Sequence, residues 1–228
     1  MSLLSLSQVT ADYGASQALF GVDLTVGEGE VVALMGRNGM GKSTTVRAIC
    51  RMVTSQGTMR FAGQDISGLS SHAVARLGVG LVPETRRAFR DLTVRENLLA
   101  VARPGHWDFA KVVALFPRLQ ERSAQRAGSL SGGEQQMLVI GRALITNPRL
   151  LILDEATEGL SPLIRQEIWT SIAQLKHETG LSILVIDKSL KELRQICDRA
   201  TVLERGRSVW DGPISDLDSE TSRRFLGV

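Results

Sequence analysis

The residues with the clearest chemical potential form a glycine-rich stretch in the first fifth of the chain. They are Gly36, Arg37, Asn38, Gly39, Met40, Gly41, Lys42 and Ser43. The stretch matches the pattern G-x-x-x-x-G-K-[ST], in which glycines let the backbone turn tightly and point N–H groups at phosphate oxygens. Lys42 is expected to reach the β- and γ-phosphates, and Ser43 to ligate Mg²⁺. The stretch, with Thr44 after it, therefore predicts a site for ATP with Mg²⁺.

An acidic pair is the second candidate for chemistry. Asp154 and Glu155 follow the apolar residues 150–153, so Asp154 is expected at the carboxyl end of a central strand, where ligands bind in open α/β sheets. There Asp154 can hold the Mg²⁺ shell, and Glu155 can orient an attacking water or accept its proton. A strand-end carboxylate that only caps the next loop fits these residues equally well. The phosphate-binding pattern upstream favours the functional interpretation.

A second glycine-rich segment lies at residues 130–136, with the sequence Leu-Ser-Gly-Gly-Glu-Gln-Gln. Ser131 is a plausible N-cap of the helix that follows, and Gly132 and Gly133 expose backbone N–H groups at its start. These features predict a second anion site in one chain. From the residues alone, a simple loop-to-helix junction is the stronger interpretation.

Continuous apolar runs indicate the elements that position these residues. Residues 31–35, 150–153 and 183–186 each end at a candidate site segment, and such runs are typical of parallel strands that are covered on both faces. Helical patterns separate them, which predicts an α/β fold with right-handed crossovers. Residues 3–26 are rich in turn residues and predict antiparallel strands at one edge.

The middle of the chain predicts an inserted helical part. Residues 93–146 are mostly helical in pattern, and residues 97–102 and 135–144 have the apolar spacing of amphipathic helices. A helix over residues 43–50 is also expected after the phosphate loop. We predict one domain, 1–228, with an α/β core at about 1–84 and 146–228 and a helical subdomain at about 85–145.

Composition and charge are those of an ordinary globular protein. The 228 residues are 43% hydrophobic and 22% charged, with a net charge of +3. No long basic run and few aromatic residues are present, which argues against a nucleic-acid partner. The two cysteines lie far apart, which indicates a reducing compartment. The chain has no apolar run of about 18 residues, so no segment is expected to span a membrane. No secretion signal is evident in the sequence either.

Taken together, residues 36–43, 130–136 and 154–155 resemble the motifs of ATP-binding cassette (ABC) proteins. The resemblance implies a P-loop NTPase (RecA-like) core with a parallel sheet. It also implies that Ser131 and Gly133 contact the γ-phosphate held by a second subunit, so that two ATP molecules lie in a head-to-tail dimer. Tyr13 matches the aromatic residue that stacks on adenine in this family; a tyrosine that only packs is the alternative.

Three positions depart from the common family pattern. Glu84 stands where most members have Gln, and it remains a hard oxygen ligand for Mg²⁺. Lys188 stands where most have His; it cannot act as the same hydrogen-bond relay, but it can place a point charge on the γ-phosphate. His177, the nearest histidine in sequence, lies in a polar stretch that predicts a solvated loop. Ser161 replaces an Asp that many members carry.

These departures point to a subgroup. Residues 82–84, 92–98, 155–160 and 186–188 resemble the shorter of the two ATPase subunits of bacterial branched-chain amino acid importers. That resemblance implies transmembrane permease subunits, a second ATPase subunit that is identical or a paralogue, and indirectly a periplasmic substrate-binding protein. It implies a peripheral location at the cytoplasmic face of the bacterial inner membrane. The subgroup also serves urea and short amides.

Two other functions remain open from the sequence. One is an ABC ATPase of a soluble machine, although the chain lacks a long coiled-coil insertion and a tandem second cassette. The other is a nucleotide-dependent regulatory module with low turnover, which Lys188 makes conceivable. A membrane permease partner distinguishes the first alternative from an importer, and measurable ATP hydrolysis distinguishes the second.

Overall fold

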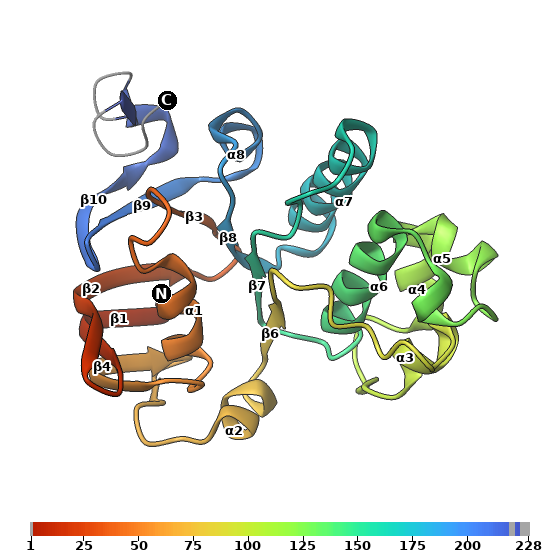
Figure 1. Ribbon diagram of the computed structural model, residues 1–228, viewed down its shortest axis with the longest axis horizontal. Helices are drawn as coiled ribbons and strands as arrows, with labels where there is room; N and C mark the ends of the chain where they lie inside the picture. Colours follow the sequence, from red (N-terminus) through yellow and green to blue (C-terminus); the bar gives the residue numbers. More distant parts are fainter. Residues whose placement is uncertain (1, 219–221, 224–228) are drawn as a thin grey trace.

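The computed structural model describes residues 2–218 and 222–223, which form two sheets and flanking helices (Figure 1). The larger sheet has six strands in the order β10-β9-β3-β8-β7-β6. Its strands are β3 (Val31–Met35), β6 (Val79–Val82), β7 (Leu150–Asp154), β8 (Ser182–Ile186), β9 (Arg199–Glu204) and β10 (Arg207–Pro213). Neighbouring strands are parallel from β9 to β6, and β10 pairs antiparallel at one edge. The three predicted apolar strands are confirmed as β3, β7 and β8.

The apolar runs exist because the larger sheet is buried on both faces. In β3, Val32 and Leu34 belong to one hydrophobic cluster, whereas Val31, Ala33 and Met35 belong to another. Successive side chains of a strand point to opposite faces, so both faces need apolar residues. Residues of β7 alternate between the same two clusters, and both strands end at a segment with candidate chemistry.

The N-terminal strands form a sheet of their own. Its four strands, in the order β2-β1-β4-β5, are β1 (Ser2–Tyr13), β2 (Ser16–Gly27), β4 (Thr54–Phe61) and β5 (Gln64–Asp65). They pair antiparallel, as predicted for residues 3–26. Helix α1 (Lys42–Ile49) buries Val46, Ala48 and Ile49 in the cluster that joins the two sheets. The short α2 (Ser71–Arg76) leads into β6.

Helices gather at the end of the molecule opposite the four-stranded sheet (Figure 1). They are α3 (Val94–Leu99), α4 (Phe109–Leu115), α5 (Pro117–Glu121) and α6 (Gly132–Leu144), with a 3₁₀ turn at Ala127–Ser129. The helix predicted over 97–102 begins earlier, because Thr93 and Glu96 form a capping box that sets its start. The division into a core and an inserted helical subdomain remains a prediction.

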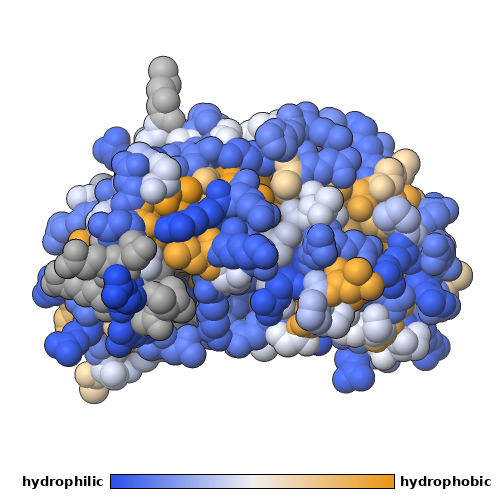
Figure 2. Space-filling model, turned by 90° about the horizontal axis from the view of Figure 1, so that it is seen from above, coloured by the Kyte–Doolittle hydropathy of each residue, from blue (hydrophilic) through white to orange (hydrophobic). Residues whose placement is uncertain are grey.

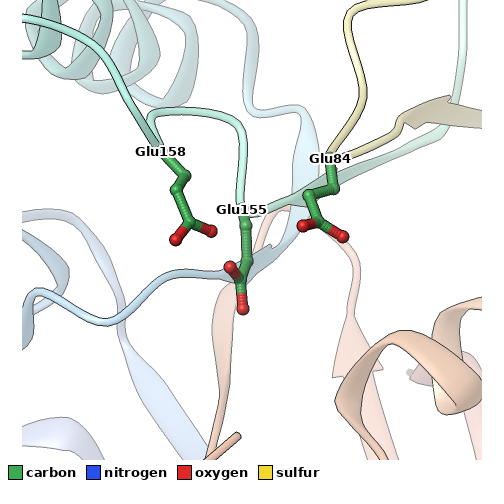
Figure 3. Close-up of side chains that lie close together, drawn as sticks. All are labelled: Glu84, Glu155 and Glu158. Atoms are coloured by element: carbon green, nitrogen blue, oxygen red, sulfur yellow. The ribbon is translucent and has the colours of Figure 1, made fainter.

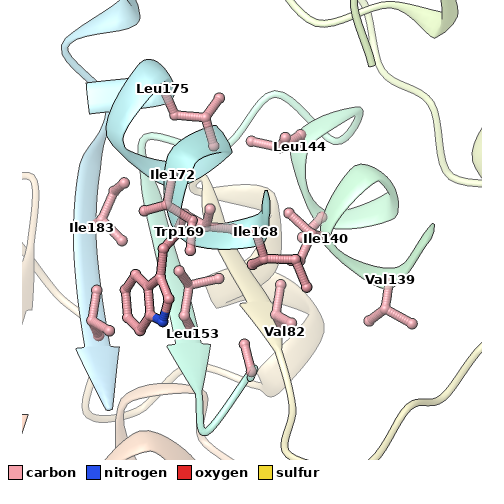
Figure 4. Close-up of a cluster of buried hydrophobic side chains, with 14 of the residues drawn as sticks. Val82, Val139, Ile140, Leu144, Leu153, Ile168, Trp169, Ile172, Leu175 and Ile183 are labelled. Carbon is pink, nitrogen blue, oxygen red and sulfur yellow. The ribbon is translucent and has the colours of Figure 1, made fainter. Parts of the chain in front are cut away.

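The remaining helices follow the acidic pair and β8. They are α7 (Pro162–Thr179) and α8 (Leu190–Ile196), and a 3₁₀ turn spans Ile214–Asp216. Figure 4 shows Ile168 and Ile172 of α7 beside Ile140 and Leu144 of α6, above Leu153 of the sheet. The loop predicted around His177 is wrong: α7 continues through this residue to a left-handed Gly180 cap, because Leu175 is buried and anchors the last turn.

The face of the molecule drawn in Figure 2 is predominantly hydrophilic. In the view of Figure 2, hydrophobic residues are exposed in a few separate areas with hydrophilic residues between them. Among the described residues, no helix has the length and apolarity needed to cross a membrane.

Candidate nucleotide site

The phosphate loop connects β3 to α1. A Cβ at Gly36, where φ is +140°, would lie 2.4 Å from the Leu203 carbonyl oxygen. A Cβ at Gly41, where φ is +102°, would lie 2.7 Å from a Leu19 side-chain carbon. Both positions therefore require glycine. The turn that they permit places Lys42 at the first position of α1.

The Lys42 side chain folds back over this loop. It is buried, and its Nζ donates hydrogen bonds to the carbonyl oxygens of Gly36 at 2.7 Å and Arg37 at 3.1 Å. Burial lowers the pKa of Lys42, and the carboxylate of Glu155 opposes that shift. The ammonium is thus held beside the loop by carbonyl groups that phosphate oxygens can replace.

Ser43 and Asp154 meet across the start of α1 and the end of β7. The Ser43 Oγ donates a hydrogen bond to Asp154 Oδ1 at 3.2 Å. Burial raises the pKa of Asp154, the bond from Ser43 lowers it, and the nearby Glu84 raises it further. A hydroxyl and a carboxylate oxygen side by side are hard ligands of the type that Mg²⁺ prefers. These two residues fit a metal site.

A cavity of about 610 Å³ lies over the phosphate loop. Its walls are formed by Gln17, Ala18, Phe20, Asn38, Gly39, Gly41, Lys42, Ser43, Thr44, Glu84, Glu155, Glu158, Lys188 and Arg205. The structure therefore brings Glu84, Glu155 and Lys188 to the loop from three distant segments. Met40 supports the loop from outside the cavity, because its carbonyl oxygen and Sδ accept hydrogen bonds from Gly206 and Arg205.

Three carboxylates and one ammonium lie close together in the wall of this cavity. Carboxylate oxygens of Glu84, Glu155 and Glu158 lie within 4.8 Å of one another (Figure 3). Lys188 Nζ lies 3.3 Å from Glu155 Oε2 and 2.7 Å from Glu158 Oε1. Burial is the largest cause that raises the pKa of Glu155 to about 7, and the contact with Glu158 adds to the rise. Lys188 opposes this shift of the pKa.

Glu158 is a site residue that the sequence reasoning missed. Glu155 adopts a left-handed conformation with φ of 47°, and the Glu158 N–H donates to the Glu155 carbonyl oxygen at 3.1 Å. This tight turn brings Glu158 back to the cavity. The only indication of this role in the sequence is that Glu158 follows Glu155 by three residues. The turn that brings the two side chains together is not evident without the fold.

Tyr13 lies at the end of β1, outside the residues that line the cavity. The residue is 44% exposed, and its hydroxyl accepts a hydrogen bond from Arg47 Nη1 at 3.0 Å. Phe20 and Arg205, which the sequence reasoning did not select, line the cavity instead. The stacking of Tyr13 on adenine remains a prediction.

The second glycine-rich segment caps α6, away from this cavity. The Ser131 Oγ accepts from the Glu134 N–H at 3.3 Å, and Glu134 Oε2 accepts from the Ser131 N–H at 2.8 Å. A Cβ at Gly133 would lie 2.6 Å from Ile164 Cγ2, and one at Gly132 would lie 2.5 Å from Arg86 Nη1. The predicted N-cap is confirmed. Ser131, Gly132 and Gly133 are not among the residues that line the cavity of their own chain.

Comparison with known proteins decides the family. The family model for the ABC transporter matches residues 19–158. The chain belongs to the ABC transporter family. As a member it binds nucleotide and is an ATPase, and the resemblance drawn from the motifs is confirmed.

Relatives of this ABC protein match over nearly its whole length. It is 44% identical to the high-affinity branched-chain amino acid transport ATP-binding protein BraG of Pseudomonas aeruginosa, over 91% of each chain. It is 33% identical to the probable branched-chain amino acid transport ATP-binding protein LivF of Archaeoglobus fulgidus, over 94% of each chain. The Nod factor export ATP-binding protein I of Rhizobium meliloti is 38% identical over 92% of this chain and 64% of that protein.

Solved structures confirm the α/β P-loop NTPase fold. The ADP conformation of MJ1267, an ATP-binding cassette of an ABC transporter, is 25% identical, with a TM-score of 0.84, and both chains are covered completely. A nucleotide-free ATP-binding cassette from an ABC transporter is also 25% identical, with a TM-score of 0.83 over 100% of this chain and 96% of the other.

Proposed function

We propose that this chain is the ATP-hydrolysing subunit of a bacterial ABC importer for branched-chain amino acids or related small amides. The observation that carries the proposal is the 44% identity to a branched-chain amino acid transport protein over 91% of both chains. Export and methionine-import proteins are also relatives, at 38% and 34% identity. The higher identity favours the amino acid cargo over these alternatives.

The cavity residues support a specific division of labour. The ATP phosphates would lie on the loop, where the Lys42 ammonium replaces its bonds to Gly36 and Arg37 with bonds to phosphate oxygens. Mg²⁺, held by Ser43 and Asp154 with Glu84 nearby, would supply positive charge against the phosphates. Glu155 would orient the attacking water in line with the γ-phosphate and accept its proton. Preorganised charge would thus carry most of the catalysis.

A second ATPase subunit, identical or a paralogue, would complete the site. The capped N-terminus of α6 presents the N–H groups of Gly132 and Gly133, which suit a phosphate. Because these residues do not line the cavity of their own chain, their phosphate would belong to the partner. Ser131 and Gly133 would then contact the γ-phosphate across the dimer interface. Hydrolysis would remove this contact and allow the dimer to separate.

A groove beside the site supports docking of the permease. It has a volume of about 440 Å³, and its lining includes the apolar residues Val46, Met52, Val74, Val101 and Val139. Four arginines also line it: Arg47, Arg87, Arg103 and Arg142. Glu84 and Asp154 also line the groove, so its arginines outnumber its carboxylates. An amphipathic permease segment that carries carboxylates would match this mixture of apolar and mainly basic groups.

Glu84 lies between the proposed permease groove and the nucleotide cavity. It lines both the groove and the nucleotide cavity, so a permease segment in the groove would lie within a few residues of the bound phosphates. The chain would therefore work at the cytoplasmic face of the inner membrane, attached through permease subunits. A periplasmic binding protein would deliver the cargo to the same complex.

Deleting the chain from its host and measuring uptake of labelled leucine tests this proposal. We expect loss of high-affinity uptake, with restoration by the wild-type chain and none by the Lys42→Ala variant. Affinity purification should recover a membrane permease with the wild-type chain. Unchanged uptake of leucine and short amides would contradict the cargo, and recovery of a soluble partner without permease would contradict the importer.

A further inference from the structure

Glu158 contributes a carboxylate that the proposed reaction does not use. Its Oε1 accepts a hydrogen bond from Lys188 Nζ at 2.7 Å, which is shorter than the 3.3 Å between the same Nζ and Glu155 Oε2. Lys188 is thus anchored primarily on Glu158 and secondarily on Glu155. One ammonium between two carboxylates also reduces the repulsion between two negative groups in close contact.

The backbone of Glu158 is held by several contacts. Arg86 Nη2 donates to the Glu158 carbonyl oxygen at 3.2 Å. The Thr157 Oγ1 donates to Asp187 Oδ2 at 2.6 Å, and the Glu155 N–H donates to the Ile186 carbonyl oxygen at 2.9 Å. These bonds tie the segment after β7 both to the Glu84 segment and to the end of β8. Glu158 is therefore a fixed point rather than a free surface group.

The backbone that carries Lys188 is tied to the same framework. Asp187 Oδ1 accepts from the Ser189 N–H at 2.9 Å, while its other oxygen accepts from Thr157. Asp187 therefore cross-links the segments of Lys188 and Glu158. The Lys188 side chain is 49% exposed, so without an anchor its flexible four-carbon stem would sample many rotamers.

We propose that Glu158 is a positioning residue that holds the Lys188 ammonium beside the Glu155 carboxylate. The consequence is that Glu155 keeps one orientation toward the cavity, because its charged partner has a fixed place. The inference rests on the proposed role of Glu155 in ATP hydrolysis. Glu158 acts through Lys188, so its contribution must disappear when Lys188 cannot form the ion pair.

A double-mutant cycle tests the dependence on Lys188. Steady-state ATP hydrolysis is measured for the ATPase–permease complex with wild-type chain, Glu158→Gln, Lys188→Gln and the double variant. We expect Glu158→Gln to lower kcat about threefold to tenfold with KM changed less than about twofold, and to have little further effect in the Lys188→Gln background. Glu158→Asp should retain part of the activity, and Glu121→Gln, an exposed glutamate on α5, is the matched control.

A measurement on the isolated, nucleotide-free chain separates this inference from the proposed function. Carbon-13 relaxation of the Lys188 side chain, assigned with Lys188→Arg, reports its order directly. We expect a restricted side chain in the wild type and in Glu121→Gln, and a mobile one in Glu158→Gln. An unchanged order parameter, or an equal loss of kcat in both Lys188 backgrounds, would overturn the positioning role. If the wild-type complex hydrolyses no ATP, the proposed function fails while the relaxation result still decides the role of Glu158.

Discussion

The backbone of Glu155 is constrained, and its carboxyl group lies where a negative charge is unfavourable. Its φ of 47° is held by the bond from its N–H to Ile186, and burial with the neighbouring Glu158 raises the pKa of its carboxyl to about 7. In the unfolded chain the same group loses its proton near 4.5. The stability that the protonated form contributes is therefore full below pH 4.5 and is lost as pH rises through about 7.

This linkage predicts a pH-dependent effect of Glu155→Gln on thermal stability. Glutamine resembles the protonated carboxyl, so the variant should keep the stability that the wild type loses at high pH. We expect a Tm higher than wild type at pH 8, by roughly 2–4 °C for each kcal/mol recovered, and nearly equal Tm values at pH 5. Scanning calorimetry measures both. A larger gain at pH 5 than at pH 8 would contradict the raised pKa.

At the scale of elements, the start of α3 is set by a few polar contacts. The Thr93 Oγ1 accepts from the Glu96 N–H at 3.1 Å, and Glu96 Oε2 accepts from the Thr93 N–H at 2.8 Å. Asn97 is fully buried, and its Oδ1 accepts a hydrogen bond from the Phe89 N–H. Its Nδ2 donates to the carbonyl oxygens of residues 89, 92 and 93. These bonds organise the segment between Glu84 and α3, which borders the groove.

Thr93→Ala should therefore destabilise the chain. Loss of the cap is expected to cost about 1 kcal/mol, which lowers Tm by roughly 2–4 °C for a chain of this size. Thr170→Ala is the matched control, because Thr170 is exposed within α7 and outside any cap. The control should change stability by less than about 0.5 kcal/mol. Equal losses in the two variants would show that the capping box does not stabilise α3.

The sequence predicted the elements whose residue types follow directly from local chemistry. Buried parallel strands need continuous apolar residues, so β3, β7 and β8 were evident, and the phosphate loop had a pattern of its own. The extent of α7 and the start of α3 were missed, because single tertiary anchors such as Leu175 and local capping bonds decide them. Glu158 and the pairing of Lys188 were missed for another reason: their contacts join segments that only the folded sheet brings together.

For the whole molecule, the groove and the cavity predict two separable activities. Arg87 and Arg103 line the groove on the side of the predicted helical subdomain, and neither lines the nucleotide cavity. Reversing both charges should weaken the complex with an acidic permease segment by about tenfold or more, with ATP affinity of the isolated chain unchanged. Arg60→Glu, an exposed change on β4, is the control. Equal permease affinity in the double variant and the control would contradict docking in the groove.

Mg²⁺-dependent ATP hydrolysis by the reconstituted complex, compared between the wild type and Glu155→Gln, tests most directly whether the chain hydrolyses ATP through Glu155. We expect the variant to bind ATP at least as tightly as the wild type but to turn it over at least about a hundredfold more slowly, because only the group that orients water is lost. ATP hydrolysis that does not depend on Glu155, or no hydrolysis by the wild type in the presence of its permease, would contradict this expectation.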